Sequence, residues 1–432
     1  MIKVQAADQR IEAPEIAPRI QSTQIGACHL LQLRTPIQSV VSWRGSFRES
    51  PSFESGEEWI QDLTVAMLDK GTKHRDRFAI ADLLENRGAQ LRFSSSGLRI
   101  GFSGKALRKD VPDVLKVMFE QLKDPLFDPD EFEKARKRIE ASLKRSLDNT
   151  RSQASEALSR CLFKKGHPSY RDAEAELEAL AHVRLDQLQA YHQSHFGLAE
   201  MNLCLVGDLD PNALAPVIEE AVLDWPHTSR QAGFEAHAHA KAPGRTDVFL
   251  PDKQNIDVLI GHALPLRRQD PDFLPLYLGT YILGGNFSSR LMSTIRDEQG
   301  LTYGIHAGLV GVNTLYDASW RVDVTLSQEN LEPGIAATMR QIKQFVEEGV
   351  SQAEVSEKKA TVIGAFKVGL ATTEGLANQL SANAERGFDL DYIDRYPERV
   401  DEVMLEEVNE AIPKYIDPAN FHQVLAGTIA VE

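Results

Sequence analysis

Arg296 and Tyr303, in the second half of the chain, could both donate hydrogen bonds to one atom of a substrate, to judge from their residue types and spacing. A helix is expected from about Ser288 to Gln299, followed by a turn at Gly300 and a strand from about Tyr303. Both side-chain tips can then converge beside the strand edge. A guanidinium and a phenol are hydrogen-bond donors. Donors placed this way stabilise a peptide carbonyl whose oxygen gains charge during attack, as in an oxyanion hole.

The same two residues have an ordinary structural alternative. Arg296 can pair on the helix surface with Asp297 or Glu298, and Tyr303 can be a half-buried aromatic of the strand. Arg290, earlier in the same helix, is interpreted as a structural residue that closes the preceding glycine turn. Residue types alone favour this alternative.

No competing catalytic system is evident in the sequence. H-x-x-E-H, G-x-S-x-G and G-x-x-x-x-G-K-[ST] are all absent. His192 and His195 are three residues apart on a helix, but without a third ligand nearby a helix-face or core pair is expected. His237 and His239 are expected to be solvated, and His74 to lie on the surface.

The glycine pair and the cysteines are interpreted as structural residues. Gly284-Gly285 could bind an anion at a helix N-terminus, but a turn that needs an open backbone is favoured. Cys28, Cys161 and Cys204 lie in apolar patterns without a C-x-x-C pair, and they are expected to be buried reduced thiols.

Composition excludes several classes of protein. The 432 residues carry a net charge of −15 with a sequence pI near 5.4, and no basic block offsets the acid. This argues against nucleic acid or an anionic membrane as the main partner. No apolar run reaches the roughly 18 residues of a spanning helix. The first 19 residues lack the apolar core of a signal peptide, so the sequence as given suggests the cytoplasm, or the periplasm if a signal was removed.

The chain contains an internal repeat with an offset of about 220 residues. Segment 128–163 has the layout of 350–388, and 177–209 that of 397–429. In the second pair, a helical stretch leads into a closing strand that ends near Gly207 or Gly427. A repeat of this size indicates two units of one design.

The expected strands and helices define the fold class. Strands are expected at 28–34, 39–45, 89–96 and 98–107 in the first half, and at 246–252, 255–264, 303–311 and 320–327 in the second. The prediction is α+β: two homologous domains, each a mainly antiparallel sheet packed with helices. The domains are placed at 1–225 and 246–432, with a linker at 226–245 that has no clear period.

One passage is specific enough to suggest a family. The segment YILGGNFSSRLMSTIRDEQGLTYGIHAG, 281–308, has a glycine turn, Ser-Ser-Arg-Leu, a helix with an arginine, and then Gly-Leu-x-Tyr. It resembles the C-terminal-half signature of the insulinase/pitrilysin-like (inverzincin) zinc peptidases, whose mark is H-x-x-E-H. In that superfamily the arginine and tyrosine, matched here by Arg296 and Tyr303, face the zinc. The resemblance also implies substrate contacts at Gly285 and Asn286.

The first half has the layout of that superfamily without its metal ligands. Histidines at i and i+4 of one helix bind zinc in the family, and the glutamate between them activates water. Counting back from Gly71, the two histidine positions hold Asp62 and Ala66, and the glutamate position holds Val65. The distal third ligand falls near Ser142. The resemblance therefore implies that this chain binds no metal of its own.

The resemblance also implies a substrate edge in the first half. The leucine and phenylalanine of Leu91-Arg92-Phe93-Ser94 are assigned to peptide binding, because an extended peptide could pair with this strand by strand addition. An inner strand of the sheet is an equally open interpretation.

The function implied by the resemblance is that of a non-zinc subunit in a heterodimeric metallopeptidase. Such a subunit would be inactive alone and would complete the active site of a homologous zinc-bearing partner through Arg296 and Tyr303. A self-dimer stays open as the assembly. The alternative function is a catalytically inert scaffold or peptide-recognition subunit of the same fold.

Overall fold

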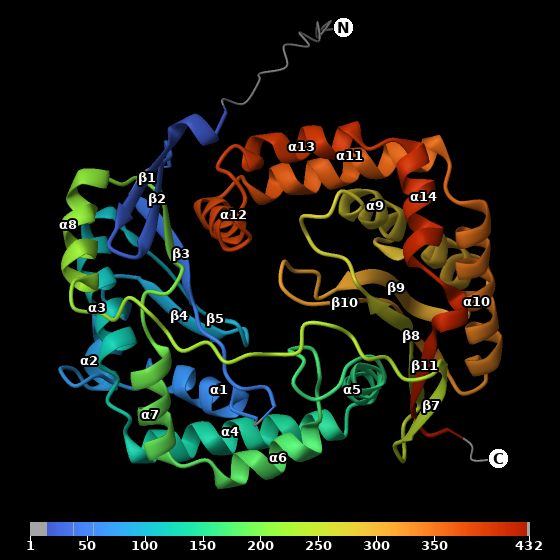
Figure 1. Cartoon of the computed structure of the whole chain (residues 1–432), viewed down its shortest axis with the longest axis horizontal. Helices are drawn as coiled ribbons and strands as arrows, with labels where there is room; N and C mark the ends of the chain where they lie inside the picture. The colour runs from blue at the N-terminus through green and yellow to red at the C-terminus, as the bar shows by residue number, and fades with distance from the viewer. Residues whose placement is uncertain (1–14, 38, 55, 430–432) are drawn as a thin grey trace, which may run out of the picture.

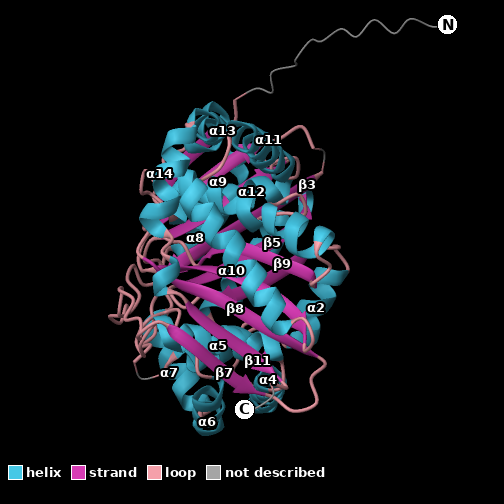
Figure 2. Ribbon diagram, turned by 90° about the vertical axis from the view of Figure 1, so that its right-hand side faces the viewer, coloured by secondary structure: helices cyan, strands magenta, loops and turns pink. Residues whose placement is uncertain are grey.

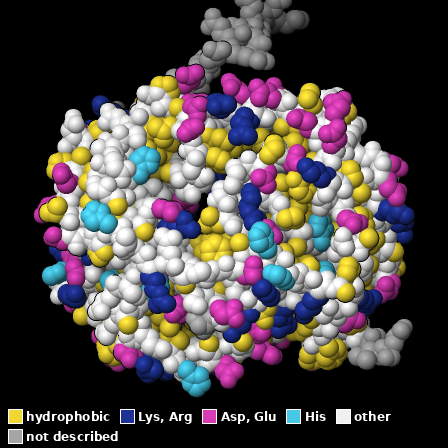
Figure 3. All heavy atoms as spheres, viewed as in Figure 1, with side chains coloured by type: hydrophobic (Ala, Val, Ile, Leu, Met, Phe, Trp, Pro, Cys, Tyr) yellow, Lys and Arg dark blue, Asp and Glu magenta, His cyan; other side chains and the backbone are white. Residues whose placement is uncertain are grey.

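In a computed structural model of the chain, two sheets with their helices face each other (Figure 1), and the space-filling view shows a hollow between them (Figure 3). The structure describes residues 15–37, 39–54 and 56–429. Most of the polar N-terminal stretch considered above lies outside the described residues. Among the described helices, none is long and apolar enough to cross a membrane.

The two sheets share one strand order. The N-terminal sheet has the order β1-β2-β6-β3-β5-β4 and the C-terminal sheet the order β7-β11-β8-β10-β9. Strand β2 pairs in parallel with β6 in the N-terminal sheet, and β7 pairs in parallel with β11 in the C-terminal sheet. The other neighbouring strands are antiparallel, and β1 is an additional edge strand of the N-terminal sheet. The strands are Ile20–Ile25 (β1), Cys28–Arg34 (β2), Val40–Arg48 (β3), Gln90–Ser95 (β4), Arg99–Leu107 (β5), Met201–Gly207 (β6), Gly244–Phe249 (β7), Asn255–Leu264 (β8), Thr302–Val310 (β9), Ala318–Ser327 (β10) and His422–Gly427 (β11).

This shared order confirms the predicted fold class and the repeat. Both closing strands end at a glycine with positive φ, +143° at Gly207 and +155° at Gly427. Strand β1 was not predicted. Its hairpin with β2 turns at Gly26, whose φ of +58° suits glycine, so a turn signal for it was present in the sequence.

Helices cover the outer faces of both sheets. Figure 2 shows α10 lying over the strands of the C-terminal sheet. The helices are Glu58–Met67 (α1), Arg77–Glu85 (α2), Val111–Lys123 (α3), Pro129–Leu147 (α4), Thr150–Leu162 (α5), Ala173–His182 (α6), Leu185–His195 (α7), Pro211–Val222 (α8), Phe273–Gly284 (α9), Leu331–Glu348 (α10), Gln352–Gly369 (α11), Thr373–Glu385 (α12), Tyr392–Glu402 (α13) and Leu405–Tyr415 (α14).

The two halves exchange one helix each. Helix α5 follows α4 in the N-terminal half, but Leu158 and Leu162 pack in one cluster with Leu259 of β8 and Val424 of β11. Helix α12 makes the reciprocal contact on strands β3 and β6 of the other sheet. Each sheet therefore buries its inner face against a helix of the opposite half, in an apolar cluster separate from the main core of either half.

Polar contacts repeat this exchange. The Thr150 hydroxyl donates to Asp257 on β8 at 2.6 Å, and the equivalent Thr373 bonds Ser42 on β3 at 2.8 Å. A second tie runs from the N-terminus, where the amides of Ile16 and Ala17 donate to the Asp394 carboxylate of α13. Backbone amides are strong donors that need a partner when buried, so this carboxylate fixes the start of the described chain to the C-terminal half.

The segment before β7 also contacts both halves. The amide of Glu235 donates to the carbonyl of Gly166 at 2.9 Å, and the amide of Asp317 donates to the carbonyl of Ala236 at 2.9 Å. The expected linker at 226–245 therefore follows a defined path between the halves. The domain limits themselves stay a prediction.

Cysteines and histidines lie mostly where the sequence placed them. All three cysteines are free and buried, and burial raises the pKa of Cys28 to about 12. His195 is buried and stacks on Tyr191 at 3.7 Å, while His192 bonds the carbonyl of Leu122. His195 is a core residue and His192 is half-buried, in line with the expected helix-face or core pair. His74 is exposed, and His237 and His239 lie near Asp317 and Glu235.

Candidate functional site at the start of strand β9

The candidate site is the corner between α9 and β9. Helix α9 is almost entirely buried and ends at Gly284, where a Cβ would lie 2.4 Å from the amide nitrogen of Ala307. Only a glycine lets β9 approach the helix end this closely. This geometry explains the glycine pair as a backbone requirement, in line with the favoured interpretation.

A segment of π-helix carries the arginine. The expected helix is present at 290–298, and Met292–Glu298 (η3) is wound as a π-helix. A π-helical turn is rare and is found frequently at functional sites. Gly300 then reverses the chain with a φ of +64°. Arg296 thus lies in the last turn of η3, and Tyr303 is the second residue of β9.

A β-bulge sets the direction of Tyr303. Ile305 pairs with Val324 and Thr302 with Leu326, so Tyr303 and Gly304 together face a single residue of β10. Bulges re-aim side chains and interrupt ladder pairing. The Thr302 hydroxyl holds the bulge by donating to the carbonyl of Thr325 at 2.6 Å. As a result the Tyr303 side chain points into solvent.

Exposure at this corner is unusually high for aromatic residues. Tyr303 is 97% exposed and Phe287 77%. The guanidinium carbon of Arg296 lies 5.6 Å from the Phe287 ring, and its Nε is 4.0 Å from Asp297. Tyr303 is therefore not the half-buried aromatic of the ordinary alternative. Among the described contacts, no hydrogen bond joins Arg296 to Tyr303.

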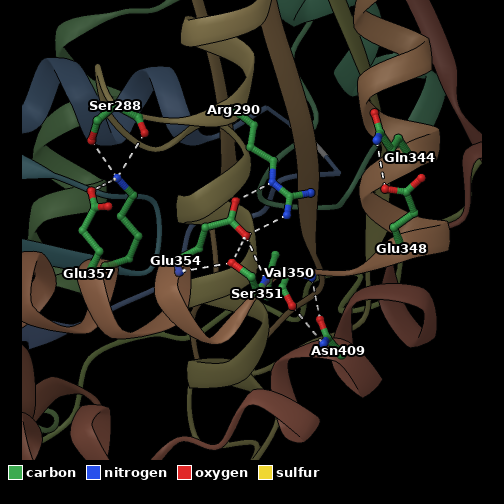
Figure 4. Close-up of polar contacts among 10 residues, drawn as sticks. Ser288, Arg290, Gln344, Glu348, Val350, Ser351, Glu354, Glu357 and Asn409 are labelled. Carbon is green, nitrogen blue, oxygen red and sulfur yellow. Dashed lines mark hydrogen bonds and ion pairs between the residues drawn. The ribbon is translucent and has the colours of Figure 1, made fainter.

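Two ion-paired residues of α11 hold the corner in place (Figure 4). Arg290 donates to both carboxylate oxygens of Glu354, at 2.6 and 2.8 Å. Lys358, buried in α11, donates to the carbonyl of Ser288 at 3.1 Å and to its hydroxyl at 2.6 Å. The bond from Arg290 is the main reason that the pKa of Glu354 is lowered to about 2. Arg290 therefore has the expected structural role. It connects the glycine turn to helix α11.

The turn residues assigned to substrate lie between these ties. Gly285 is packed so that a Cβ would meet the Tyr281 side chain, and Asn286 bonds Ser288 through its side chain at 3.3 Å. Both are partly exposed beside Phe287. Their backbone and amide groups can face a bound chain, and their substrate role stays a prediction.

The strand proposed as substrate edge is an edge strand. β4 ends the N-terminal sheet as β9 ends the C-terminal sheet, so the alternative of an inner strand is wrong. Leu91 and Phe93 pack against the N-terminal core, however, and Arg92 and Ser94 are the exposed side chains. Leu91 and Phe93 therefore attach the strand to the core and do not face a ligand at the free edge. The free edge consists of backbone groups, which can pair with an added strand.

Helix α1 shows what stands at the zinc-motif positions. Asp62 accepts a hydrogen bond from the Ser95 hydroxyl of β4, and burial raises the pKa of its carboxyl. Val65 is in the apolar core, Ala66 is half-buried, and Ser142 is exposed on α4. One carboxylate without an imidazole does not match the three-ligand set of a catalytic zinc ion. Across the described residues, no group of three His, Cys, Asp or Glu could hold a metal.

A buried carboxyl behind α1 was missed by the sequence reasoning. Glu49 is fully buried and accepts from the Tyr191 hydroxyl at 2.7 Å and from the side-chain amide of Gln61. Burial is the main cause that raises its pKa to about 8. The sequence gave no sign that Glu49 is buried, because its hydrogen-bond partners Tyr191 and Gln61 lie on two helices that are not adjacent to it in the sequence. Its contacts join α1 and α7.

Comparison with known proteins defines the class. Residues 63–171 match the family described as "Insulinase (Peptidase family M16)", and 182–362 match "Peptidase M16 inactive domain". The chain belongs to the M16 insulinase family. With Asp62, Val65 and Ala66 in place of the zinc motif, it is a half-length member of the inactive type.

Individual relatives extend along most of the chain. It is 22% identical over 358 residues to the "Non-peptidase homolog YmxG" of Helicobacter pylori, covering 83% of this chain and 82% of that protein. A crystal structure of a peptidase M16 inactive domain from Pseudomonas fluorescens superposes with a TM-score of 0.87 at 23% identity, covering 96% and 98% of the two chains. The ferredoxin protease FusC, solved with Arabidopsis ferredoxin, gives a TM-score of 0.75 at 16% identity, with 96% of this chain on 45% of that one.

Proposed function

We propose that this chain is the non-zinc subunit of a heterodimeric metallopeptidase and completes a partner's active site with Arg296 and Tyr303. The observation that carries the proposal is the exposure of the corner. Tyr303 is 97% exposed on a bulge that turns it outward, and Arg296, on the preceding element η3, lies next to an exposed phenylalanine. A side chain exposed in this way can reach a substrate that is held by a second chain.

The chemistry proposed for the pair is donation to the substrate. A zinc ion in the partner would activate the water that attacks a peptide carbonyl, and negative charge would then develop on the carbonyl oxygen. A guanidinium and a phenol held near that oxygen stabilise it, and each such donor contributes about 10²–10³ in rate. Bonds from charged groups are the stronger ones. The zinc and the water-activating base would belong to the partner, a homologous chain with H-x-x-E-H.

The anchoring of the corner supports this role. Arg290 with Glu354, and Lys358 with Ser288, fix the backbone on the turn before Arg296. Catalytic donors must be held to within about 0.5 Å. These ties restrain the turn from inside the chain and involve neither Arg296 nor Tyr303.

The test is peptide cleavage by the purified chain with added zinc, alone and mixed with a co-encoded chain that bears H-x-x-E-H. We expect cleavage in the mixture alone. Arg296→Ala and Tyr303→Phe should each lower the cleavage rate about 100-fold while leaving the affinity between the chains unchanged. Arg395→Ala, which removes an exposed arginine of α13, serves as the matched control.

Other outcomes assign the chain differently. An unchanged rate with either variant refutes the role of the pair. Chelator-sensitive cleavage by the chain alone would show that it has a metal site of its own. Absence of cleavage in every combination favours the inert scaffold or recognition subunit.

A further inference from the structure

Phe287 is an exposed aromatic residue in the turn that precedes the helix of Arg296. Most of its side chain meets solvent, although phenylalanine usually lies in the interior of a protein. The guanidinium carbon of Arg296 lies over the ring, 5.6 Å from the ring centre. A cation within about 6 Å of a ring centre is attracted by the negative face of the ring. The exposed ring therefore has a partner, and this partner is the arginine that is proposed to act on the substrate.

The helix directs Arg296 toward this ring. Side chains on a helix lean toward its N-terminus, and the helical stretch 290–298 begins three residues after Phe287. A long arginine side chain in its last turn can therefore extend back toward the preceding turn. The contact with Phe287 agrees with the direction that the helix gives to the side chain.

The backbone beside the ring is fixed. Ser288, the residue after Phe287, accepts bonds from Lys358 of α11 at its carbonyl and its hydroxyl. Arg290 donates to both carboxylate oxygens of Glu354 on the same helix. Because these bonds restrain the turn, the Phe287 ring projects from a defined position although most of its surface is exposed.

The guanidinium of Arg296 has few other restraints. Among the described residues, its side chain forms no hydrogen bond, and its Nε lies 4.0 Å from a carboxylate oxygen of Asp297, which is too far for a hydrogen bond. Contact with a ring needs no hydrogen-bond acceptor, so the N–H groups of Arg296 stay available for a ligand. A closer pair with Asp297 would occupy some of these donors.

Arg77 provides a comparison within the same chain. It lies 4.5 Å from the ring centre of Phe78, which is also exposed. Unlike Arg296, however, Arg77 also forms an ion pair with Glu131, at 3.3 Å. The ring is therefore one of two restraints on Arg77, whereas it is the main restraint on Arg296.

We infer that Phe287 is a positioning residue that holds the guanidinium of Arg296 and leaves its N–H donors free for a substrate carbonyl. The contact itself is a property of this chain alone, and its effect on catalysis rests on the proposed function. At an exposed site, a contact of this kind changes an equilibrium about two- to fivefold. Loss of the ring should therefore lower the cleavage rate by that factor, whereas loss of Arg296 should lower it about 100-fold.

The first measurement is nuclear magnetic resonance of the full chain alone with isotope-labelled arginine. The Nε–H resonance of Arg296 is identified by its loss in Arg296→Ala. We expect this resonance to move in Phe287→Leu, because leucine is apolar but has no aromatic ring current. Phe78→Leu is the matched control, which should move the resonance of Arg77 and leave that of Arg296 in place. An Arg296 resonance that is unchanged by Phe287→Leu would overturn the inference.

The second measurement is cleavage by the mixture of chains. Phe287→Leu should lower kcat about two- to fivefold and leave KM unchanged, because charge develops on the carbonyl oxygen only in the transition state. Phe287→Trp should retain the rate, since tryptophan attracts cations most strongly. In the Arg296→Ala background, Phe287→Leu should have no further effect. Phe78→Leu should change neither kcat nor KM.

The outcomes separate the inference from the proposed function. A further loss with Phe287→Leu in the Arg296→Ala background would show that the ring contacts the substrate itself, and would overturn the inference. An unchanged kcat with Phe287→Leu, where Arg296→Ala lowers it, would also overturn it. If no mixture cleaves, or if neither Arg296→Ala nor Tyr303→Phe changes the rate, the proposed function fails. The resonance of Arg296 then still decides whether the ring holds the guanidinium.

Discussion

Glu354→Gln tests the tie that holds the candidate corner. The substitution keeps the size of the side chain but removes the charge that receives both bonds from Arg290. A pKa lowered from 4.5 to about 2 corresponds to at most about 3 kcal/mol of unfolding free energy. The side chains of Arg290 and Glu354 are 26% and 28% exposed. Solvent screening therefore reduces the expected loss to roughly 1–2 kcal/mol.

The pH dependence of this loss has a definite sign. The carboxyl of Glu354 has a lower pKa in the folded chain than in the unfolded one. Its contribution is therefore complete above about pH 4.5 and is lost as the pH falls toward 2. Urea unfolding followed by circular dichroism should show the largest difference between wild type and variant at neutral pH. The difference should shrink below pH 4.5.

The matched control is Glu347→Gln on α10, whose pair with Lys343 is exposed on both sides. It should change the unfolding free energy by less than about 0.5 kcal/mol. If Glu354→Gln proves no more destabilising than this control at neutral pH, the tie does not anchor the corner. In the mixed-chain assay, Glu354→Gln should also lower the cleavage rate, because the turn that precedes Arg296 loosens.

Three further predictions concern stability. Glu49→Gln should flatten the pH dependence of unfolding: the raised pKa of Glu49, about 8, makes the wild type lose stability as pH rises from about 4.5 to 8, by up to about 1.4 kcal/mol per pH unit. Gly284→Ala should cost about 1–3 kcal/mol in urea titrations, because its Cβ meets the backbone of Ala307 at 2.4 Å. Leu158→Ala should cost about 2–5 kcal/mol by the same measurement, whereas the exposed Leu223→Ala should cost almost nothing.

Elements within one half could be predicted because their signals are local. The strand expected at 255–264 is β8 with the same limits, and the period of apolar residues was sufficient to place it. Gly300 was expected to turn the chain and has a positive φ there. The repeat also appeared in the sequence, because helices and strands recur in the same order at a constant offset.

The shape of the candidate corner needed information that local patterns lack. A bulge depends on the pairing of Thr302 and Ile305 with a strand some twenty residues further on, so the exposure of Tyr303 could not be predicted. The π-helical winding at Arg296 has the same apolar spacing as an α-helix over a few residues. Leu91 and Phe93 were assigned to the ligand because an edge strand has two faces, and the sequence does not say which face the core occupies.

Contacts between the halves are the part of the structure that sequence reasoning could not predict. Helix α12 belongs by sequence to the C-terminal half, yet it packs on β3 and lines a cavity together with Arg44 from the opposite half. Glu49 likewise finds Tyr191 far along the chain. Because Arg44 and its hydrogen-bond partner Asn378 are 334 residues apart in the sequence, no spacing rule brings them together. A motif search therefore detects the lost zinc positions and the retained Arg296 and Tyr303, but it cannot detect contacts formed by the exchange of helices.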